Sequence, residues 1–183
     1  MHMVKPGLTL LLLIAVTTLL LGFVYDITRE PIRIQQELRQ QAIIAELIHG
    51  TYEFDEIFFE NVPNVTSGIV GYNAAGDRLG FALAATAPGY AAAVDIMVGF
   101  NLDGVITGVS IVNHRETPGL GTAIATPAFL NQFAGRTEAM TVTRMPSGPN
   151  EIAALTSATI STDAVINGIN AALAYITTFI EEN

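Results

Sequence analysis

The segment that organises this chain reads Leu155-Thr156-Ser157-Ala158-Thr159-Ile160-Ser161, and it carries four hydroxyl groups in seven residues. This segment and the apolar periodicity after it predict a helix over residues 162–182, with Ser161 or Thr162 as its N-cap. The free N–H groups at such a helix start donate hydrogen bonds to the hydroxyl oxygen of a cap, and they also favour an anion such as phosphate. Residue types alone favour the ordinary cap, with phosphate binding as the alternative. The helical spacing is carried by Val165, Ile166, Ile169, Leu173 and Ile176.

Upstream of this segment, apolar runs alternate with turn signals, a pattern that is typical of a meandering antiparallel sheet. Gly76-Asp77 and Pro88-Gly89 are two of these turns, and Asn101-Leu102-Asp103-Gly104 predicts a short hairpin. The sheet and its segregated helices make the expected fold class α+β, an antiparallel sheet with flanking helices. The predicted strands are residues 68–72, 80–86, 92–100 and 105–112.

Three further segments complete this expectation for the domain. Residues 51–64 are acidic and aromatic, and they predict a loop or a short helix that leads into the core. Residues 127–133 predict a helix with Phe129, Leu130 and Phe133 turned inward. Residues 145–150 are rich in Pro and Gly and predict a loop.

The N-terminus predicts a membrane anchor. Residues 6–25 form a charge-free run of 20 residues, and at about 1.5 Å per helical residue this run reaches about 30 Å, the thickness of a bilayer core. A cleaved signal peptide is the alternative, but no small-x-small cleavage site follows the run. The expected organisation is therefore a transmembrane anchor over 1–25, an amphipathic connecting helix over 26–50 and one domain over 51–183.

The connecting helix carries two further expectations. Pro31 kinks it or marks a restart, since proline lacks the N–H that a helix interior needs. The predicted apolar face consists of Ile34, Leu38, Ile44 and Leu47.

Composition narrows the function classes. The chain has a net charge of −9, which argues against a nucleic-acid partner. It has no Cys, so thiolate catalysis and Cys-ligated iron–sulfur clusters within the chain are excluded. Its three His residues are scattered without the spacing of metal ligands, so no metal site is expected.

Two stretches resemble one known family. Thr156-Ser157-Ala158-Thr159 is similar to the flavinylation signature Asp-x-x-(Ser/Thr)-Gly-Ala-Thr, and His114-Arg115-Glu116-Thr117-Pro118-Gly119-Leu120-Gly121 resembles a second motif of the same FMN-binding domain. Gly89-Tyr90 and the hairpin region also look like this family. The domain occurs in the G subunit of Rnf-type ferredoxin:NAD oxidoreductase complexes and in the C subunit of sodium-translocating NADH:quinone reductases. The Rnf subunit is favoured by three features together: the Glu-Thr-Pro-Gly-Leu-Gly string, its spacing to Ser157-Ala158-Thr159 and the N-terminal hydrophobic segment.

The resemblance implies an electron-transfer subunit of a membrane-bound, ion-translocating oxidoreductase complex. FMN would be joined to Thr159 through a phosphoester, and a separate flavin transferase would make this bond with FAD as the FMN donor. The implied partners are other membrane subunits of the same complex. Charge bias opposes the extracytoplasmic domain that the family implies, because Arg29, Arg33 and Arg39 follow the anchor while Lys5 precedes it.

The implied cofactor site combines the two motifs. In the second motif, two Gly residues would let the backbone approach a flat ring, and Leu120 and Leu155 would cover it. The signature's Asp aligns with Ala153 and its Gly with Ser157, and these departures put the rate of flavinylation and the strain at Ser157 in question. The expected cofactor-binding residues are Thr159, Thr156, Ser157, Ala158, Leu155, Ile160, Glu116, Thr117, Gly119, Leu120 and Gly121.

Two other functions stay open at this point. One is a membrane-anchored non-redox binding or assembly domain that has lost flavin, for which Ala153 is the best support. The other is a free-standing flavin reductase with noncovalent FMN, which the lack of a nucleotide-binding Gly fingerprint disfavours.

Overall fold

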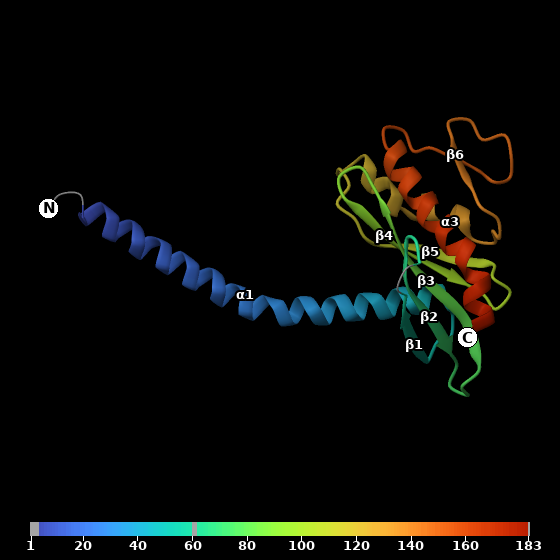
Figure 1. The fold of residues 1–183 in the computed structure, drawn as a ribbon, viewed down its shortest axis with the longest axis horizontal. Coiled ribbons are helices and arrows are strands. Elements are labelled where there is room, and N and C mark those ends of the chain that lie inside the picture. Colours follow the sequence, from blue (N-terminus) through green and yellow to red (C-terminus); the bar gives the residue numbers. More distant parts are fainter. Residues whose placement is uncertain (1–3, 60–61, 183) are drawn as a thin grey trace. The chain divides into compact units, whose positions relative to one another are not determined.

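The computed structural model describes residues 4–59 and 62–182, and the chain divides into two compact units, Met1–Gln41 and Ala42–Asn183. Figure 1 shows the chain coloured from the N-terminus to the C-terminus. Helix α1 (Val4–Leu47) supplies most of the first unit, and its last turns belong to the second.

Helix α1 runs through Pro31 without a break, so a restart at this residue is excluded. Arg33 makes ion pairs of 2.6 Å with both Glu30 and Glu37, which bracket the proline on the exposed surface. Solvent screens such exposed pairs, so they support the helix only modestly. The region Gly7–Leu47 is long and apolar enough to cross a membrane, with a mean hydropathy of 2.5 over its best window.

The predicted apolar face of the connecting helix is half right. Ile44 and Leu47 lie in the second unit and are buried, 1% and 3% exposed. Ile34 and Leu38 lie in the first unit and are exposed. The buried face of the last turns continues instead through Ile43 and Ile48.

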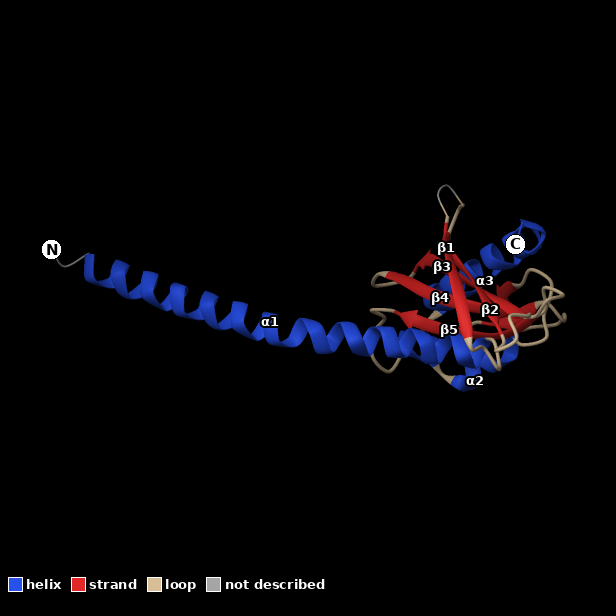
Figure 2. Cartoon of the chain, turned by 90° about the horizontal axis from the view of Figure 1, so that it is seen from below, coloured by secondary structure: helices blue, strands red, loops and turns tan. Residues whose placement is uncertain are grey.

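The second unit is built on one five-stranded antiparallel sheet in the order β1-β2-β3-β4-β5 (Figure 2). Each strand pairs with its neighbours in sequence, so the predicted meander is confirmed. The hairpin at 101–104 is also present, with Gly104 at φ +76° and Asn101 donating its N–H to the Val105 carbonyl. The strands are β1 (Glu53–Phe58), β2 (Val65–Tyr72), β3 (Arg78–Pro88), β4 (Ala93–Phe100) and β5 (Ile106–Asn113).

Both faces of this sheet are buried, which explains the nearly continuous apolar runs in β2 to β4. Successive strand residues point to opposite faces. In β3, Ala82 packs in a cluster with the last turns of α1, whereas Phe81 and Leu83 pack in the larger core with helix α3 (Thr159–Glu182). A sheet covered on both faces needs apolar residues at every position, so strict alternation is lost.

The apolar periodicity of α3 is confirmed, since Val165, Ile166, Ile169, Leu173 and Ile176 are all buried. α3 is long and apolar enough to span a membrane, but half of its best window is buried inside the domain. It therefore serves as the core helix of the domain. Phe179 lies near its end and packs edge-to-face against Phe81 of the sheet, with ring centroids 5.8 Å apart.

The prediction of a loop or short helix over 51–64 is wrong, because β1 (Glu53–Phe58) forms an edge strand there. Its Phe54 and Ile57 are half-buried while Glu53, Asp55 and Glu56 are exposed. Charged residues are favoured on edge strands because they discourage pairing with other chains. The acidic character of β1 thus reflects its place at the sheet edge.

The segment between β5 and α3 is mostly irregular. Helix α2 (Pro127–Leu130) and the 3₁₀ turn η2 (Asn131–Phe133) realise the helix predicted for 127–133, with Phe129 and Phe133 buried and Leu130 partly buried. Residues 144–150 form the predicted loop, but the flanking pair β6 (Thr141–Thr143) and β7 (Glu151–Ala153) was not predicted. The remaining element is the 3₁₀ helix η1 (Gly121–Ala125).

Candidate functional site

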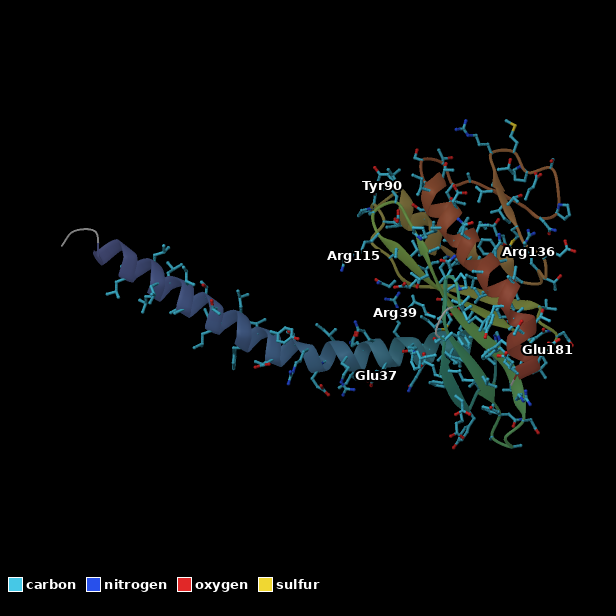
Figure 3. All side chains as sticks on the ribbon, in the orientation of Figure 1. Glu37, Arg39, Tyr90, Arg115, Arg136 and Glu181 are labelled. Atoms are coloured by element: carbon cyan, nitrogen blue, oxygen red, sulfur yellow. The ribbon has the colours of Figure 1, made fainter. Side chains whose placement is uncertain are left out.

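One end of the sheet carries a cavity of about 510 Å³ that lies entirely within the second unit. Three segments build it: the turn after β3, the turn after β5 and the beginning of α3. Tyr90 lies on the first of these turns, near the start of α3 (Figure 3). The lining residues are Tyr90, Glu116, Thr117, Leu120, Gly121, Ser157, Ala158, Thr159, Ile160 and Ser161.

A buried carboxylate holds these segments together. Glu116 is 4% exposed, and its Oε1 accepts the N–H groups of Tyr90 at 2.9 Å and Ala91 at 3.3 Å. Its Oε2 accepts the hydroxyl of Ser161 at 2.6 Å. The Nδ1 of His114 accepts the Glu116 N–H at 3.3 Å, which fixes the approach of the chain to this residue. Glu116 therefore connects both sheet-end turns to the first turn of α3.

Two glycines make room for this carboxylate. A Cβ on Gly89 would lie 2.4 Å from the Glu116 Oε1. A Cβ on Gly121 would lie 2.8 Å from the Glu116 Cβ and Oε2. Both positions exclude a larger residue because atoms this close overlap, so Gly121 is required by its contact with Glu116 whatever the cavity holds.

The start of α3 differs from the prediction. The helix begins at Thr159, so neither Ser161 nor Thr162 is its N-cap. The Ser161 hydroxyl is engaged by Glu116, and the Thr162 hydroxyl donates to the Ala158 carbonyl at 2.9 Å while accepting the Leu155 N–H at 3.1 Å. Ser161 therefore makes a tertiary hydrogen bond and Thr162 makes local ones, and neither side chain caps the helix.

Thr159 keeps its hydroxyl available. Its side chain is exposed to the cavity, and among the described residues it has no hydrogen-bond partner. The Thr162 N–H already donates to the Ala158 carbonyl at 2.9 Å, so the helical N–H groups that point outward are those of residues 159–161. An anionic group on Thr159 would lie at the positive end of the α3 dipole.

Ser157 turns the chain into this helix at φ +63°. This is the left-handed region, which glycine occupies without steric cost and serine does not. The strain expected at this position is therefore present.

The comparisons with known proteins agree with this geometry. Residues 89–174 match the sequence profile of the FMN-binding domain, and residues 1–47 match that of the RnfG N-terminal region. Residues 89–174 belong to the FMN-binding domain family. The match of 89–174 contains all the lining residues of the cavity.

Relatives with full-length similarity point to one branch of the FMN-binding domain family. The G subunit of an ion-translocating oxidoreductase complex from Methanosarcina acetivorans is 27% identical over 177 residues, which is 94% of this chain and 93% of that protein. The G subunit of a proton-translocating ferredoxin:NAD(+) oxidoreductase complex from Clostridium ljungdahlii is 28% identical, covering 90% of this chain and 86% of that protein.

Solved structures confirm the fold of the FMN-binding domain. NqrC of Shewanella oneidensis superposes with a TM-score of 0.53 over 69% of this chain and 68% of its own, at 17% identity. The C subunit of a Na(+)-translocating NADH-quinone reductase from Parabacteroides distasonis gives the same TM-score over 74% of this chain and 80% of its own, at 20% identity. The α+β fold class is confirmed by both.

The cavity brings together most of the residues expected from the FMN-binding motifs, but three lie outside it. Leu155 is half-buried and packs on the core, and Thr156 is exposed. Gly119 is exposed at φ +76°, and its N–H donates to the Thr122 hydroxyl at 3.1 Å.

Two lining residues were absent from the expected FMN site. Tyr90 is 69% exposed and lies in the Gly89-Tyr90 pair that resembles the family, so the signal was present but unassigned. The local pattern predicts Ser161 as a helix cap. In the structure its hydroxyl instead bonds to Glu116, 45 residues away in sequence.

No acidic residue takes the place of the signature's Asp, which aligns with Ala153, among the described residues next to it. Ala153 is exposed at the end of β7. The Glu151 carboxylate accepts the N–H and hydroxyl of Ser147 at 2.6 and 3.1 Å, and these bonds hold the pKa of Glu151 below its usual value. Glu151 is therefore committed to its own loop.

Proposed function

We propose that this chain is a membrane-anchored electron-transfer subunit of an ion-translocating oxidoreductase complex, with FMN covalently attached to Thr159. Its similarity to G subunits along nearly their whole length supports the subunit assignment. The apolar helix α1 supports membrane attachment. The single observation that carries the attachment is the Thr159 hydroxyl, which lies in the cavity at the start of α3 and has no hydrogen-bond partner in the described part of the chain.

The residues of the cavity fit FMN. The helix start offers N–H groups and a favourable dipole to a phosphate on Thr159. Tyr90, Leu120 and Ile160 line the cavity with exposed apolar surface, which suits a flat aromatic ring. FMN supplies the electron-transfer chemistry when bound, and the protein contributes its position and electrostatic surroundings.

The attachment itself needs a second enzyme. A threonine hydroxyl is a weak nucleophile, and no side chain among the described residues hydrogen-bonds to the Thr159 hydroxyl to serve as its base. A flavin transferase that uses FAD would remove the Thr159 proton, join the oxygen to the FMN phosphorus and release AMP. This chain is then the substrate of the transferase and afterwards the carrier of the flavin.

Mass spectrometry of the protein from its native host tests the proposal. The peptide that contains Thr159 should carry the mass of FMN less water, and Thr159→Ala should abolish it. Thr156→Ala is the control and should keep the attachment with reduced yield, because Thr156 lies outside the cavity. An unmodified Thr159 in an active complex would contradict the attachment.

Ala153 favours one alternative function, a membrane-anchored binding or assembly domain that has lost flavin. If the signature Asp guides the transferase, its absence leaves Thr159 unmodified. Flavin fluorescence on a denaturing gel separates the two functions, since only covalent flavin migrates with the chain. A non-fluorescent, stable protein from the native host would favour the alternative.

We also propose that the domain after the anchor is extracytoplasmic, as the family resemblance implies. Acidic residues interleave with the three arginines that follow the anchor and weaken the opposing charge bias. Protease added to cells with an intact inner membrane should digest the domain. Full protection until that membrane is lysed would place the domain in the cytoplasm.

A further inference from the structure

Glu116 is a buried charge without a cationic partner in the described part of the chain. Burying an unpaired carboxylate is costly unless hydrogen bonds replace its hydration. Here two backbone N–H groups and one hydroxyl do so, and all three partners donate. Charge-assisted bonds of this kind are about twice as strong as neutral ones, so the cluster resists distortion.

The donors come from segments that are far apart in sequence. Tyr90 and Ala91 precede Glu116 by 26 and 25 residues, and Ser161 follows it by 45. Ser161 lies in the first turn of α3, two residues after Thr159. Because a helical turn moves as a unit, the bond between Ser161 and Glu116 sets where the Thr159 hydroxyl stands in the cavity.

We infer that Glu116 is a positioning residue, which assembles the attachment site through Ser161 before any cofactor arrives. This inference rests on the proposed attachment at Thr159. The Glu116 carboxylate acts through the backbone at 90–91 and through the first turn of α3, and in the described part of the chain it makes no hydrogen bond to the Thr159 hydroxyl.

A geometric role and a charge role can be separated at this residue. In Glu116→Gln the amide oxygen still accepts the N–H groups of Tyr90 and Ala91, and the amide NH₂ donates to the Ser161 hydroxyl, which accepts as well as donates. Glu116→Gln therefore keeps the connections and removes the charge. Glu116→Ala removes both.

The chain also offers a matched control for Ser161. Ser67 in β2 is buried, 5% exposed, and its hydroxyl donates to Glu56 Oε1 at 3.2 Å. Neither residue lines the cavity. Ser161→Ala and Ser67→Ala each remove a hydrogen bond from a buried serine to a glutamate, at the site to the buried Glu116 and away from it to the exposed Glu56.

The first measurement is hydrogen exchange of the full chain in detergent, made without the transferase. Glu116→Ala and Ser161→Ala should speed exchange in the first turns of α3, and Glu116→Ala should also speed it at Tyr90 and Ala91. Ser67→Ala and Glu116→Gln should leave both regions near wild type. Unchanged exchange in Glu116→Ala would overturn the inference, whether or not the wild type carries flavin.

The second measurement is the initial rate of FMN incorporation by the transferase, followed by intact mass. Misplacement of about 1 Å costs on the order of 10²-fold in rate. The incorporation rates of Glu116→Ala and Ser161→Ala should therefore be lower than the wild-type rate by up to about this factor, while the rate of Glu116→Gln stays within about tenfold of wild type. Equal losses in Ser161→Ala and Ser67→Ala would indicate stability alone and overturn the positioning role. Absence of FMN from the wild type would instead refute the proposed function.

Discussion

The turn 116–121 and the helix start 157–161 face the same cavity, but they are held in different ways. The turn, here called the packed wall, is fixed at its two ends, since Glu116 and Gly121 are buried against each other while residues 117–120 are exposed. The helix start, here called the open wall, is also buried at Ala158 and Ser161, but it presents an exposed Thr159 and follows a strained Ser157. A packed wall sets geometry, and an open wall leaves a hydroxyl for chemistry. Substitutions in the two walls should therefore damage different properties.

The largest effect is expected at Gly121. A valine Cβ there would meet the Glu116 side chain at 2.8 Å and the Ser161 hydroxyl at 3.0 Å. Overpacking of this kind costs about 1–3 kcal/mol, and here it also breaks the Glu116 cluster. Gly121→Val should lower the midpoint of denaturant unfolding of the protein made without transferase, and FMN incorporation should fall with it. A variant with normal stability and altered flavin would show that Gly121 instead serves ring contact.

A smaller effect is expected at Gly119 in the same turn. Its φ of +76° disfavours side chains, but no atom lies within 4 Å of a Cβ built there. Gly119→Val should cost about 1–2 kcal/mol in left-handed strain, while Gly119→Asn should cost less because asparagine tolerates this region.

Flavin attachment should survive both Gly119 variants, since the attachment signature lies elsewhere. If the turn packs on the ring, redox titration of fully flavinylated Gly119→Val should give a shifted potential, with Gly119→Asn as the control for strain. An unchanged absorption spectrum and potential in both variants would remove Gly119 from the flavin's surroundings.

Only part of the fold could be predicted from the sequence. The strands β2 to β5 and the core face of α3 follow from apolar patterns and turn residues, which act locally. β1 was missed because its acidic residues match an edge position that only the folded sheet defines. The short pair β6 and β7 was missed because three residues a strand give too little pattern.

The site was also predictable only in part. Motif resemblance identified Thr159 and Glu116, and the structure places both around one cavity. The partner of Ser161 was not predictable, because a hydroxyl before an apolar helix satisfies the local rule for a cap. Its bond to Glu116 depends on how the end of β5 meets α3, which is a property of the tertiary fold.

The smallest effect is expected at Ser157, which precedes the first turn of α3 in the open wall. Ser157 occupies φ +63°, where the family signature has Gly. Relief of left-handed strain returns about 1–2 kcal/mol, and the added freedom of glycine in the unfolded chain removes about 0.5–1 kcal/mol of it. Ser157→Gly should therefore raise the free energy of unfolding slightly, by about 0.5–1 kcal/mol, as measured by denaturant titration of the protein made without transferase.

Ser157→Ala is the control, because alanine removes the hydroxyl and keeps the strain. If strain alone matters, Ser157→Ala should match the wild type in stability while Ser157→Gly exceeds it. FMN incorporation at Thr159 should be kept in both, since the Ser161–Glu116 bond that positions the first turn is untouched. A Ser157→Gly variant that is less stable than the wild type would contradict this prediction. It would mean that the serine side chain itself stabilises the turn before α3 by more than the left-handed strain costs.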